Sequence, residues 1–433
     1  MARVTVIGTG YVGLIQGVCL ADVGHDVICV DTDVEKIAML RAGRSPIFER
    51  GLDDLLAKTI ASGRITFATP SEGWSQLYGD IVFVAVGTPQ SDNGAADLSS
   101  VRAVAASIAQ EARHPLTVVM KSTVPPGTGA TLCARVFADA DVRIDYVSNP
   151  EFLREGHAIQ DWYETDRVVI GADDAAAAER VAALYSSLGS PVVITDVASA
   201  ETIKYASNAF LSTKISFINE IANLCDCIGA DIDDVARGIG LDRRIGSHFL
   251  NAGIGYGGSC FPKDTRALDF IATLNGYDFD LLKSVIDVNN RQRLLPVIHL
   301  AKAFPDLHRR KVAVLGLSFK PHTDDVRESP ALDIVPLLLQ EGARVACYDP
   351  IAGNFELGAA VRVDTVWEAL DGASAAVLTT EWQEFRDLDW SRARALMADE
   401  PIVFDGRNAL DREALVSAGF RYMAVGRPGE HRG

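Results

Sequence analysis

The sequence predicts an α/β protein with two doubly wound domains, joined by a long central helix and a helical middle domain. Three observations lead to this prediction. A strand–glycine turn–helix–strand unit occupies residues 3–31, and a related unit recurs at residues 310–349. Between them, residues 198–228 contain neither Pro nor Gly and continue an apolar pattern of helical period. A βαβ unit repeated on both sides of a long helix indicates two similar domains.

Length and charge restrict the classes of function. At 433 residues the chain is too long for one ordinary core, so several domains are expected. Lys and Arg total 41 against 58 Asp and Glu, which gives a formal net charge of −17. Such an acidic surface argues against general binding of nucleic acid or of anionic membranes. An anionic substrate would need a locally basic pocket.

Apolar runs and cysteines point to the cytoplasm. No segment reaches the roughly 18 apolar residues needed to cross a bilayer. The first residues run directly into a strand, which is not the pattern of a signal peptide. The seven cysteines form no CxxC pair, which argues against disulfide staples and against a metal site. Four of them lie among aliphatic residues and are interpreted as small core side chains: Cys19, Cys29, Cys133 and Cys347.

The first unit has the full dinucleotide-binding pattern. An apolar strand at residues 3–7 precedes Gly8-Thr9-Gly10-Tyr11-Val12-Gly13, a helix to about Gly24 and a second strand. In this pattern Gly8 makes the tight turn, Gly10 lets a pyrophosphate approach and Gly13 lets the helix pack on the strand. The helix N-terminus supplies amide donors for phosphates.

The residue that closes the second strand selects the cofactor. Asp31 can accept both ribose hydroxyls and would repel a 2′-phosphate, so the sequence predicts NAD. Lys36, in the next helix, is a candidate for the adenosine side, and a solvated helix lysine is the alternative. Loops after strands at 80–86 and 116–120 carry Thr88 and Thr123, where ribose and nicotinamide contacts would fall. Thr123 and its neighbour Ser122 could instead cap a helix.

Two carboxylates follow the next strand, after Asn149-Pro150. Glu151 and Glu155 would share one face if this stretch is a helical turn, and would then be acid–base candidates. The alternative is a pair of solvated acids that complement a helix dipole. Strands at 167–171 and 192–195 close the first domain, which we assign to residues 1–196.

The long helix begins the middle domain, assigned to residues 197–304. Lys204 and Asn208 are four apart, so they share a face of the helix and form a candidate pocket pair. A lysine that merely snorkels to solvent is the alternative. Residues 265–303 return to helix, with a polar break expected at 287–291.

Gly257-Gly258-Ser259-Cys260-Phe261-Pro262-Lys263-Asp264 has the composition that covalent catalysis by a cysteine requires. A thiol becomes a useful nucleophile when nearby positive charge or amide dipoles stabilise its thiolate. The glycines before Cys260 allow close approach by a substrate. A glycine loop can also be mere slack, but Lys263 and Asp264 beside the cysteine favour a site.

The recurring unit predicts a second Rossmann-like domain, assigned to residues 305–433. Its loop at 317–330 lacks the three glycines of the first unit. The loop offers Lys320 and Arg327 instead, which suggests a different phosphate-bearing ligand.

These motifs together resemble the UDP-glucose/GDP-mannose dehydrogenase family over essentially the whole chain. The resemblance rests on residues 8–13, 149–156, 204–208, 257–264 and 319–330. It implies oxidation of C6 of a nucleotide sugar from alcohol to carboxylate, with two NAD molecules used in turn. It also implies a homodimer formed through the long helix, and a role in polysaccharide biosynthesis.

The resemblance assigns the catalytic roles. Cys260 would trap the C6 aldehyde as a thiohemiacetal and then become a thioester, while Lys204 and Asn208 would stabilise oxyanions. Asp264 and Glu151, with Thr123 and a bound water, would transfer protons and hydrolyse the thioester.

The resemblance also assigns the binding roles. Cofactor contacts would come from the glycine motif with Tyr11 and Val12, from Asp31, Lys36, Thr88 and Thr123, from Glu155 near the nicotinamide, and from Lys263 and Arg327 near phosphates. Substrate contacts would come from Glu151, Phe152, Leu153, Lys204, Asn208, Arg244 (of the partner subunit), Phe249, Asn251, Gly255, Gly257, Phe319 and Lys320.

Phe261, where the GDP-mannose branch would have leucine, favours UDP-glucose as substrate. The usual Pro-Asp-Arg is Thr165-Asp166-Arg167 here, a loop change that affects no catalytic role. GDP-mannose and UDP-N-acetyl sugars remain alternative substrates. A two-electron hydroxyacid dehydrogenase would not need the cysteine, and a non-catalytic NAD sensor would have no use for Cys260, Lys204 and Asp264 together.

Overall fold

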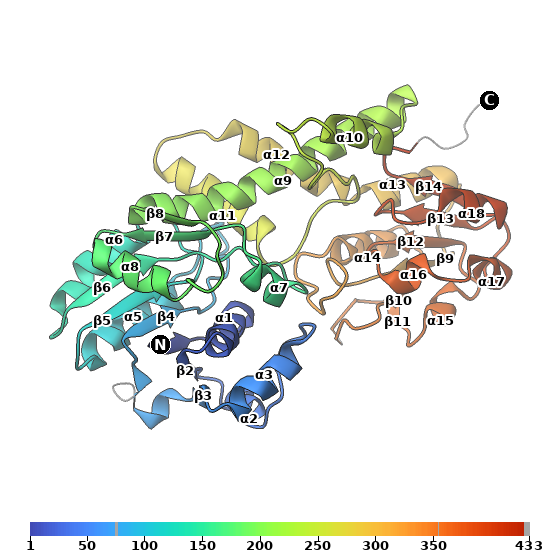
Figure 1. Ribbon diagram of the computed structural model, residues 1–433. Helices are drawn as coiled ribbons and strands as arrows, with labels where there is room; N and C mark the ends of the chain where they lie inside the picture. The colour runs from blue at the N-terminus through green and yellow to red at the C-terminus, as the bar shows by residue number, and fades with distance from the viewer. Residues whose placement is uncertain (74–76, 354, 428–433) are drawn as a thin grey trace. The chain divides into compact units, whose positions relative to one another are not determined.

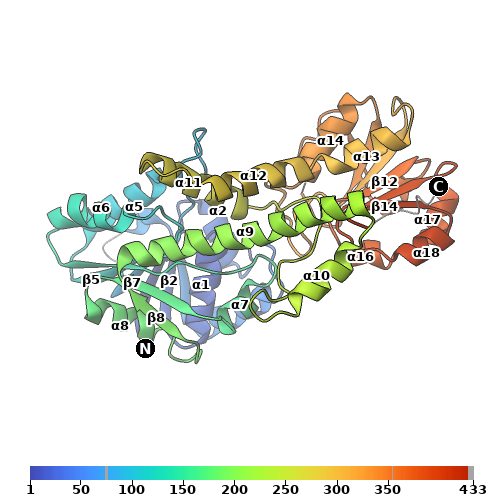
Figure 2. The same ribbon diagram turned by 90° about the horizontal axis from the view of Figure 1, so that it is seen from above.

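The computed structural model describes residues 1–73, 77–353 and 355–427 (Figure 1). The chain divides into two compact units, Met1–Ser207 and Asn208–Gly433. The division falls within helix α9 (Val197–Ile228), which Figure 2 shows as one unbroken helix. Each unit contains a sheet dominated by parallel strands, so the predicted α/β class is confirmed. The three-domain boundaries at 196 and 304 stay predictions.

The first unit is built on an eight-stranded sheet in the order β3-β2-β1-β4-β5-β6-β7-β8. Neighbouring strands are parallel except β6 and β7, which are antiparallel. The strands are β1 (Arg3–Ile7), β2 (Asp26–Val30), β3 (Ile65–Ala68), β4 (Ile81–Val84), β5 (Leu116–Met120), β6 (Ile144–Ser148), β7 (Val168–Ala172) and β8 (Val192–Thr195). The helices are α1 (Tyr11–Asp22), α2 (Val34–Arg41), α3 (Leu52–Ala61), α5 (Ser99–Glu111), α6 (Thr128–Arg135), α7 (Ala158–Tyr163) and α8 (Ala175–Ala183).

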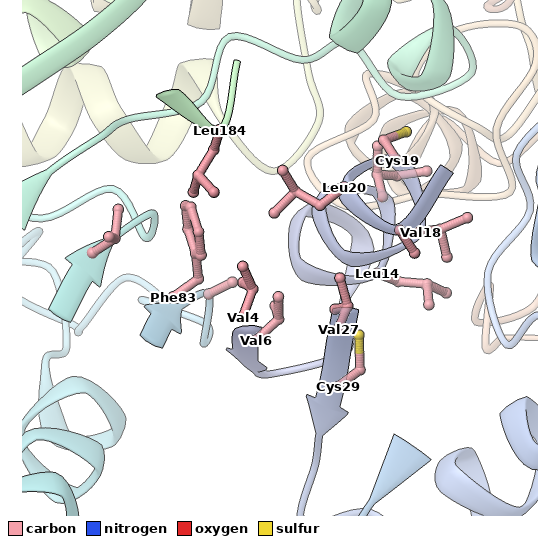
Figure 3. Close-up of a cluster of buried hydrophobic side chains, with 14 of the residues drawn as sticks. Val4, Val6, Leu14, Val18, Cys19, Leu20, Val27, Cys29, Phe83 and Leu184 are labelled. Carbon is pink, nitrogen blue, oxygen red and sulfur yellow. The ribbon is translucent and has the colours of Figure 1, made fainter. Parts of the chain in front are cut away.

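Two apolar cores cover the faces of this sheet, because successive strand residues point to opposite sides. Val119 belongs to one core and its neighbour Val118 to the other. Figure 3 shows the first core, where Val27 of β2 lies near Leu14 of α1, and Val4 and Val6 of β1 lie near Phe83 of β4. The carboxyl ends of the parallel strands therefore meet at one edge, where ligands bind in such sheets.

The cysteines behave largely as the sequence predicts. Cys19, Cys29 and Cys347 are fully buried in apolar cores. Cys133 is only half-buried, because it lies on α6 at the margin of the second core of the first unit.

Two local expectations for this unit are wrong. Residues 151–154 form no helix, so Glu151 and Glu155 do not share a helical face. Pro150 disfavours helical geometry before it, and Gly156 has a φ of +80° that ends the segment in a turn. Ser122 and Thr123 do not cap a helix either, because α6 begins only after Gly127.

The second unit begins with helices. They are the part of α9 from Asn208 onward, α10 (Ile232–Gly240), α11 (Phe261–Leu274), α12 (Asp280–Gln292) and α13 (Leu295–Ala303). Figure 2 shows α12 running beside α9, where Ser216 donates a hydrogen bond of 2.9 Å to the carbonyl of Val285. The polar break expected at 287–291 is wrong. Helix α12 continues through it because Asn289 is buried and bonds a neighbouring loop.

A six-stranded, fully parallel sheet follows in the order β11-β10-β9-β12-β13-β14. The strands are β9 (Lys311–Leu315), β10 (Arg344–Tyr348), β11 (Val361–Arg362), β12 (Ala375–Leu378), β13 (Ile402–Asp405) and β14 (Arg421–Ala424). The helices are α14 (Ala331–Gln340), α15 (Val366–Leu370), α16 (Gln383–Arg386), α17 (Trp390–Leu396) and α18 (Arg412–Ser417). Within the described ranges, no helix is long and apolar enough to cross a membrane.

Candidate active site

The glycine turn of the first unit has room for a ligand at one position. Gly8 has a φ of +96°, and a Cβ there would lie 2.6 Å from the carbonyl oxygen of Ala85. A Cβ on Gly13 would collide with the carbonyl of Gly8. A Cβ on Gly10, by contrast, would meet no atom within 4 Å. Packing explains the first two glycines, and the open space at Gly10 leaves room for the pyrophosphate that this motif is expected to bind.

Asp31 is held as an ionised carboxylate at the end of β2. Its oxygens accept hydrogen bonds from the amide (2.7 Å) and hydroxyl (2.8 Å) of Thr9 and from the amide of Asp33 (3.0 Å). Burial raises the pKa of Asp31, but these donors and Lys36, at 3.6 Å, outweigh burial and lower it. A fixed negative charge here suits ribose hydroxyls and repels a 2′-phosphate.

The loops after β4 and β5 are joined where the sequence predicts cofactor contacts. The hydroxyl of Thr88 donates a hydrogen bond of 3.0 Å to the carbonyl of Thr123. Ser122 donates to the carbonyl of Val86 at 2.6 Å. The two predicted threonines therefore belong to one site.

Tyr11 ties the glycine turn to the segment after β6. Its hydroxyl bonds the carboxylate of Glu49, and both groups accept the amide proton of Gly156, at 2.6 and 2.8 Å. Burial, followed by the bond to Glu49, raises the pKa of Tyr11. Because Gly156 follows Glu155, these hydrogen bonds fix the backbone beside Glu155, a predicted nicotinamide contact. Sequence reasoning missed Glu49, which stands outside every recognised motif.

Glu151 and Lys204 form a buried ion pair. Their charged groups lie 3.0 Å apart, with side chains 6% and 5% exposed. Burial raises the pKa of Glu151, but Lys204 beside it brings the net shift below the ordinary value. Lys204 also lies 5.3 Å from the centre of the Phe152 ring, whose face Arg167 covers at 3.7 Å. The amide of Leu153 donates to Glu151 at 2.6 Å, so the structure brings Glu151, Phe152, Leu153 and Lys204 together.

Two further ionisable groups in this unit were missed from the sequence. Lys121, directly after β5, is 6% exposed, and Glu201 on α9 is 2% exposed. Glu201 accepts the amide protons of Gly127 (2.7 Å) and Gly129 (2.8 Å). A lysine following a buried strand was a usable signal for Lys121. Nothing in the sequence marks Glu201, which is separated from its partners by more than 70 residues.

In the second unit, Cys260 is the N-cap residue of α11. Amide dipoles at a helix N-terminus favour a thiolate over a thiol. The hydroxyl of Ser259 lies 3.6 Å from its sulfur. Pro262 in the first turn is compatible with helix initiation, so the sequence stiffens the turn just after the thiol.

Asp264 lies one turn after Cys260 on α11 and is 1% exposed. Its carboxylate accepts hydrogen bonds from the amide of Asn208 (2.6 Å) and from Lys263 (2.5 Å). Asn208 is in turn one helical turn beyond Lys204 on α9. The structure thus brings Asn208, Lys263 and Asp264 together. Lys263, predicted to contact phosphate, here neutralises the carboxylate.

Side-chain hydrogen bonds hold the loop before Cys260 in a defined conformation. Asn289 accepts the amide proton of Tyr256 (2.8 Å) and donates to its carbonyl (3.1 Å). Arg407 donates to the carbonyls of Gly255 (2.8 Å) and Phe319 (3.2 Å). Gly255 has a φ of +91°, and a Cβ on Gly258 would lie 2.7 Å from the Phe319 ring. The glycines therefore permit the close packing that Asn289 and Arg407, both missed from the sequence, hold in place.

The remaining predicted substrate and phosphate contacts of this unit are less buried. Phe249 adopts a φ of +64°, unusual for an aromatic residue, and Asn251 beyond it is exposed. Arg244 is exposed and paired with Asp242 at 2.5 Å. Arg327 is likewise exposed and paired with Asp325 at 2.7 Å. Lys320 lies 5.2 Å from the centre of its neighbour's ring, Phe319, and is half-buried.

Known proteins resemble the chain along its whole length. Residues 2–189 match the NAD binding domain of the UDP-glucose/GDP-mannose dehydrogenase family, residues 198–291 its central domain and residues 313–412 its UDP binding domain. UDP-glucose 6-dehydrogenases of Bacillus subtilis and Rhizobium meliloti are each 48% identical, with 98% of this chain and 98% and 100% of theirs aligned.

Solved structures agree with this resemblance. A UDP-glucose dehydrogenase from the archaeon Pyrobaculum islandicum superposes with a TM-score of 0.90 at 38% identity, over 98% of this chain and 97% of that one. A UDP-D-ManNAc dehydrogenase from Pyrococcus horikoshii gives 0.87 at 27% identity, over 98% and 99%. The predicted cofactor, NAD, is confirmed by the first domain match. With a complete glycine turn, a cysteine at the N-cap of α11 and all three domains matched, the chain belongs to the UDP-glucose/GDP-mannose dehydrogenase family.

Proposed function

We propose that this chain oxidises the C6 alcohol of UDP-glucose to a carboxylate, with two NAD molecules used in turn and Cys260 as the covalent handle. The observation that carries the proposal is Cys260 at the N-cap of α11, at the end of a fixed glycine loop and one turn from the buried Asp264. Relatives named UDP-glucose 6-dehydrogenase at 43–48% identity support this substrate.

The cofactor is held by the first unit. The turn from Gly8 to Gly13 faces the pyrophosphate, Asp31 the ribose, and the Thr88 and Thr123 loops the nicotinamide side. Tyr11, Val12, Lys36 and Glu155 are the further predicted contacts. When bound, NAD supplies a ring that accepts a hydride.

In the first oxidation, Glu151 and Lys204 act on the substrate alcohol. The Glu151 carboxylate is ionised, so it can accept the hydroxyl proton. The Lys204 ammonium stabilises the negative charge that develops on the C6 oxygen as the hydride leaves carbon. Both groups are buried, which strengthens their effect on that charge.

In the second oxidation, the thiolate of Cys260 adds to the aldehyde carbon, forming a C–S bond and a thiohemiacetal. Departure of a second hydride leaves a thioester. Water, activated with the help of Asp264 and Thr123, attacks the thioester; the C–S bond breaks and the thiolate is released with a carboxylate. In sum, one alcohol, two NAD and one water give one carboxylate, two NADH and three protons. Asn208, fixed to Asp264, adds a donor for the oxyanions.

The second unit recognises the nucleotide sugar. The first unit adds Phe152 and Leu153 beside Glu151. We propose the following contacts in the second unit: Arg244, Phe249, Asn251, Gly255, Gly257, Phe319 and Lys320, with Lys263 and Arg327 near phosphate groups. The half-buried Phe319 and Lys320 offer a ring and a cation side by side, which suits a nucleoside diphosphate.

Replacing Cys260 with Ser tests the proposal. The wild-type chain is expected to release two NADH per UDP-glucose consumed, because the aldehyde stays bound between the hydride transfers. Cys260→Ser should abolish this turnover while NAD binding, followed by protein fluorescence, stays normal. Cys227→Ser, which changes an exposed cysteine on α9, is the matched control and should turn over normally. A ratio near one, or turnover by the Cys260 variant, would contradict the covalent route. A panel including GDP-mannose and UDP-N-acetyl sugars checks the substrate.

We also propose a cytoplasmic homodimer formed through α9. Four large apolar side chains of α9 are 52–66% exposed: Phe210, Phe217, Leu224 and Ile228. Their spacing of seven, seven and four residues puts them on one face of the helix, as in helix–helix seams. Light scattering on the intact chain measures the dimer.

A further inference from the structure

Lys121 is a buried ammonium group whose hydrogen bonds go to neutral oxygens. It follows β5 and is 6% exposed. Its Nζ donates to the side-chain oxygen of Asn149 at 3.1 Å and to the hydroxyl of Tyr185 at 3.4 Å. A buried cation without a carboxylate in its hydrogen-bonding shell is costly, so its persistence calls for an explanation. The catalytic scheme above does not use it.

A chain of hydrogen bonds holds this lysine in place. The Tyr185 hydroxyl donates to Asn149 at 2.6 Å and accepts from Gln16 of α1 at 3.0 Å. Gln16 in turn accepts from the indole of Trp162 of α7 at 3.1 Å. Every member of this chain is at most 5% exposed. Lys121 is therefore fixed by groups from two helices, the end of β6 and the turn after α8.

Two residues after Asn149, the hydrogen-bond partner of Lys121, the chain carries the carboxylate of Glu151. Lys121, Asn149, Tyr185 and Glu151 line one small cavity of about 30 Å³. That volume suffices for about one water molecule. The cavity therefore connects the lysine network with the proposed proton acceptor.

The other charged groups around this cavity each have an interaction partner of their own. Lys204 pairs with Glu151 at 3.0 Å. Asp161, which also lines the cavity, is bound by Arg154 at 2.6 Å. Arg167 lies over the Phe152 ring at 3.7 Å. Lys121 lines the same cavity as Glu151, so the Glu151 carboxylate is influenced by the charge of Lys121 as well as by its ion-pair partner Lys204.

Burial lowers the pKa of Lys121 to about 7, an effect that Glu151 opposes and Lys204 reinforces. Near neutral pH the lysine therefore changes charge. When it is charged, it lowers the proton affinity of Glu151; when it is neutral, that influence disappears.

We propose that Lys121 is a positioning residue whose ammonium, held by Asn149 and Tyr185 in the cavity that Glu151 also lines, sets how strongly the Glu151 carboxylate accepts the substrate proton. The inference rests on the proposed function, in which Glu151 is that acceptor. Loss of the lysine proton makes Glu151 a stronger base and speeds the first hydride transfer. The protonation state of Lys121, which does not itself react, thus controls the basicity of Glu151.

The first test is the pH dependence of single-turnover NADH formation from UDP-glucose. We expect the wild-type rate to rise about fivefold between pH 6 and pH 8. Lys121→Met removes the charge, so its rate should stay at the high value throughout this pH range. Lys121→Arg is always charged, so its rate should stay at the low value. Tyr185→Phe removes a hydrogen-bonding hydroxyl but no charge, so its rate should still rise between pH 6 and pH 8. A purely structural lysine would instead lower the rates of both Lys121 variants and leave the rise with pH in place, which would overturn the proposal.

The second test needs no turnover and no folded Lys121 variant. NMR of lysine side chains labelled with ¹³C at Cε follows the titration of Lys121 in the intact chain. Glu151→Gln should lower its midpoint by about one pH unit, because a coupling between two groups acts equally in both directions. An unchanged midpoint would overturn the inference. Absence of NADH from UDP-glucose in the wild-type chain would instead refute the proposed function and leave this coupling standing.

Discussion

The two βαβ units start with the same turn and then diverge. Gly8 has a φ of +96° and its amide bonds the carbonyl of Val30 at 2.8 Å; Gly316 has a φ of +101° and bonds Tyr348 at 2.8 Å. In the first unit, α1 begins at once, at Tyr11, so its amide donors face the turn. In the second, α14 begins only at Ala331, after a long loop. One turn presents a helix N-terminus to a ligand, and the other presents a loop.

The acids that close the second strand of each unit diverge in the same way. Asp31 receives three hydrogen bonds, two of them from Thr9, and its side chain is 13% exposed. Asp349 is 4% exposed and receives six: from the amides of Leu317, Ser318, Ile351 and Ala352, the Ser318 hydroxyl and the Trp382 indole. The second acid is fully used in folding its own loop. The equivalent position therefore has a structural role in the second unit, whereas a ligand contact is predicted for Asp31 in the first.

Removing each acid should give the largest contrast. Asp349→Ala leaves six donors, five of them in buried hydrogen bonds, without this acceptor and should cost about 4 kcal/mol of unfolding free energy. Asp31→Ala, the matched control, should cost about 1 kcal/mol and mainly weaken NAD binding. Urea unfolding followed by hydrogen exchange measures the stability of each unit. Equal losses of stability in both variants would contradict the assigned difference between the acids.

The sequence predicted the repeated unit but not this divergence. The glycine motif, Asp31 and the cysteine loop were recognisable because short spacing fixes their geometry. Glu201, Lys121 and Arg407 were missed because their roles arise from partners far away in the chain. The helical turn expected for Glu151 and Glu155 is absent, and the segment ends instead in a turn at Gly156, whose φ is +80°. Local rules therefore predict elements and motifs, whereas burial and long-range hydrogen bonds decide which polar residues act together.

A second contrast concerns pH, because two buried carboxylates respond in opposite directions. Burial raises the pKa of Glu201 to about 7 even though Gly127, Gly129 and Tyr146 donate to it. Burial also acts on Asp349, but its more numerous donors lower its pKa below the ordinary value. At Asp349 the hydrogen-bond donors outweigh burial, whereas at Glu201 burial outweighs the donors.

Because the pKa of Glu201 is raised in the folded chain, the first unit should lose stability as pH rises. Between the unfolded value of 4.5 and about 7 the folded chain holds the proton more tightly, so about 3 kcal/mol of unfolding free energy should disappear across this window. Asp349 contributes stability above its unfolded value of 3.8, which is lost only in more acidic solution. Glu201→Gln should flatten the first unit's decline, measured by hydrogen exchange between pH 5 and pH 8. Curves that run parallel to the wild type would contradict it.

The smallest expected effect gives the sharpest distinction between the two turns. Gly10 has a φ of −69°, which any residue adopts, and its Cβ position is empty. Gly10→Ala should therefore leave the unfolding free energy within about 0.5 kcal/mol of the wild type. It should nevertheless weaken NAD binding about thirtyfold, roughly 2 kcal/mol, because the added methyl group occupies the approach of the pyrophosphate. Gly316→Ala is the matched control in the other turn: its Cβ would strike Thr380, so it should cost stability and leave NAD affinity unchanged. Titration calorimetry with NAD and urea unfolding of the two variants measure both quantities. If Gly10→Ala bound NAD normally, the open space at Gly10 would not be the pyrophosphate site, and the first turn would differ from the second only in its packing.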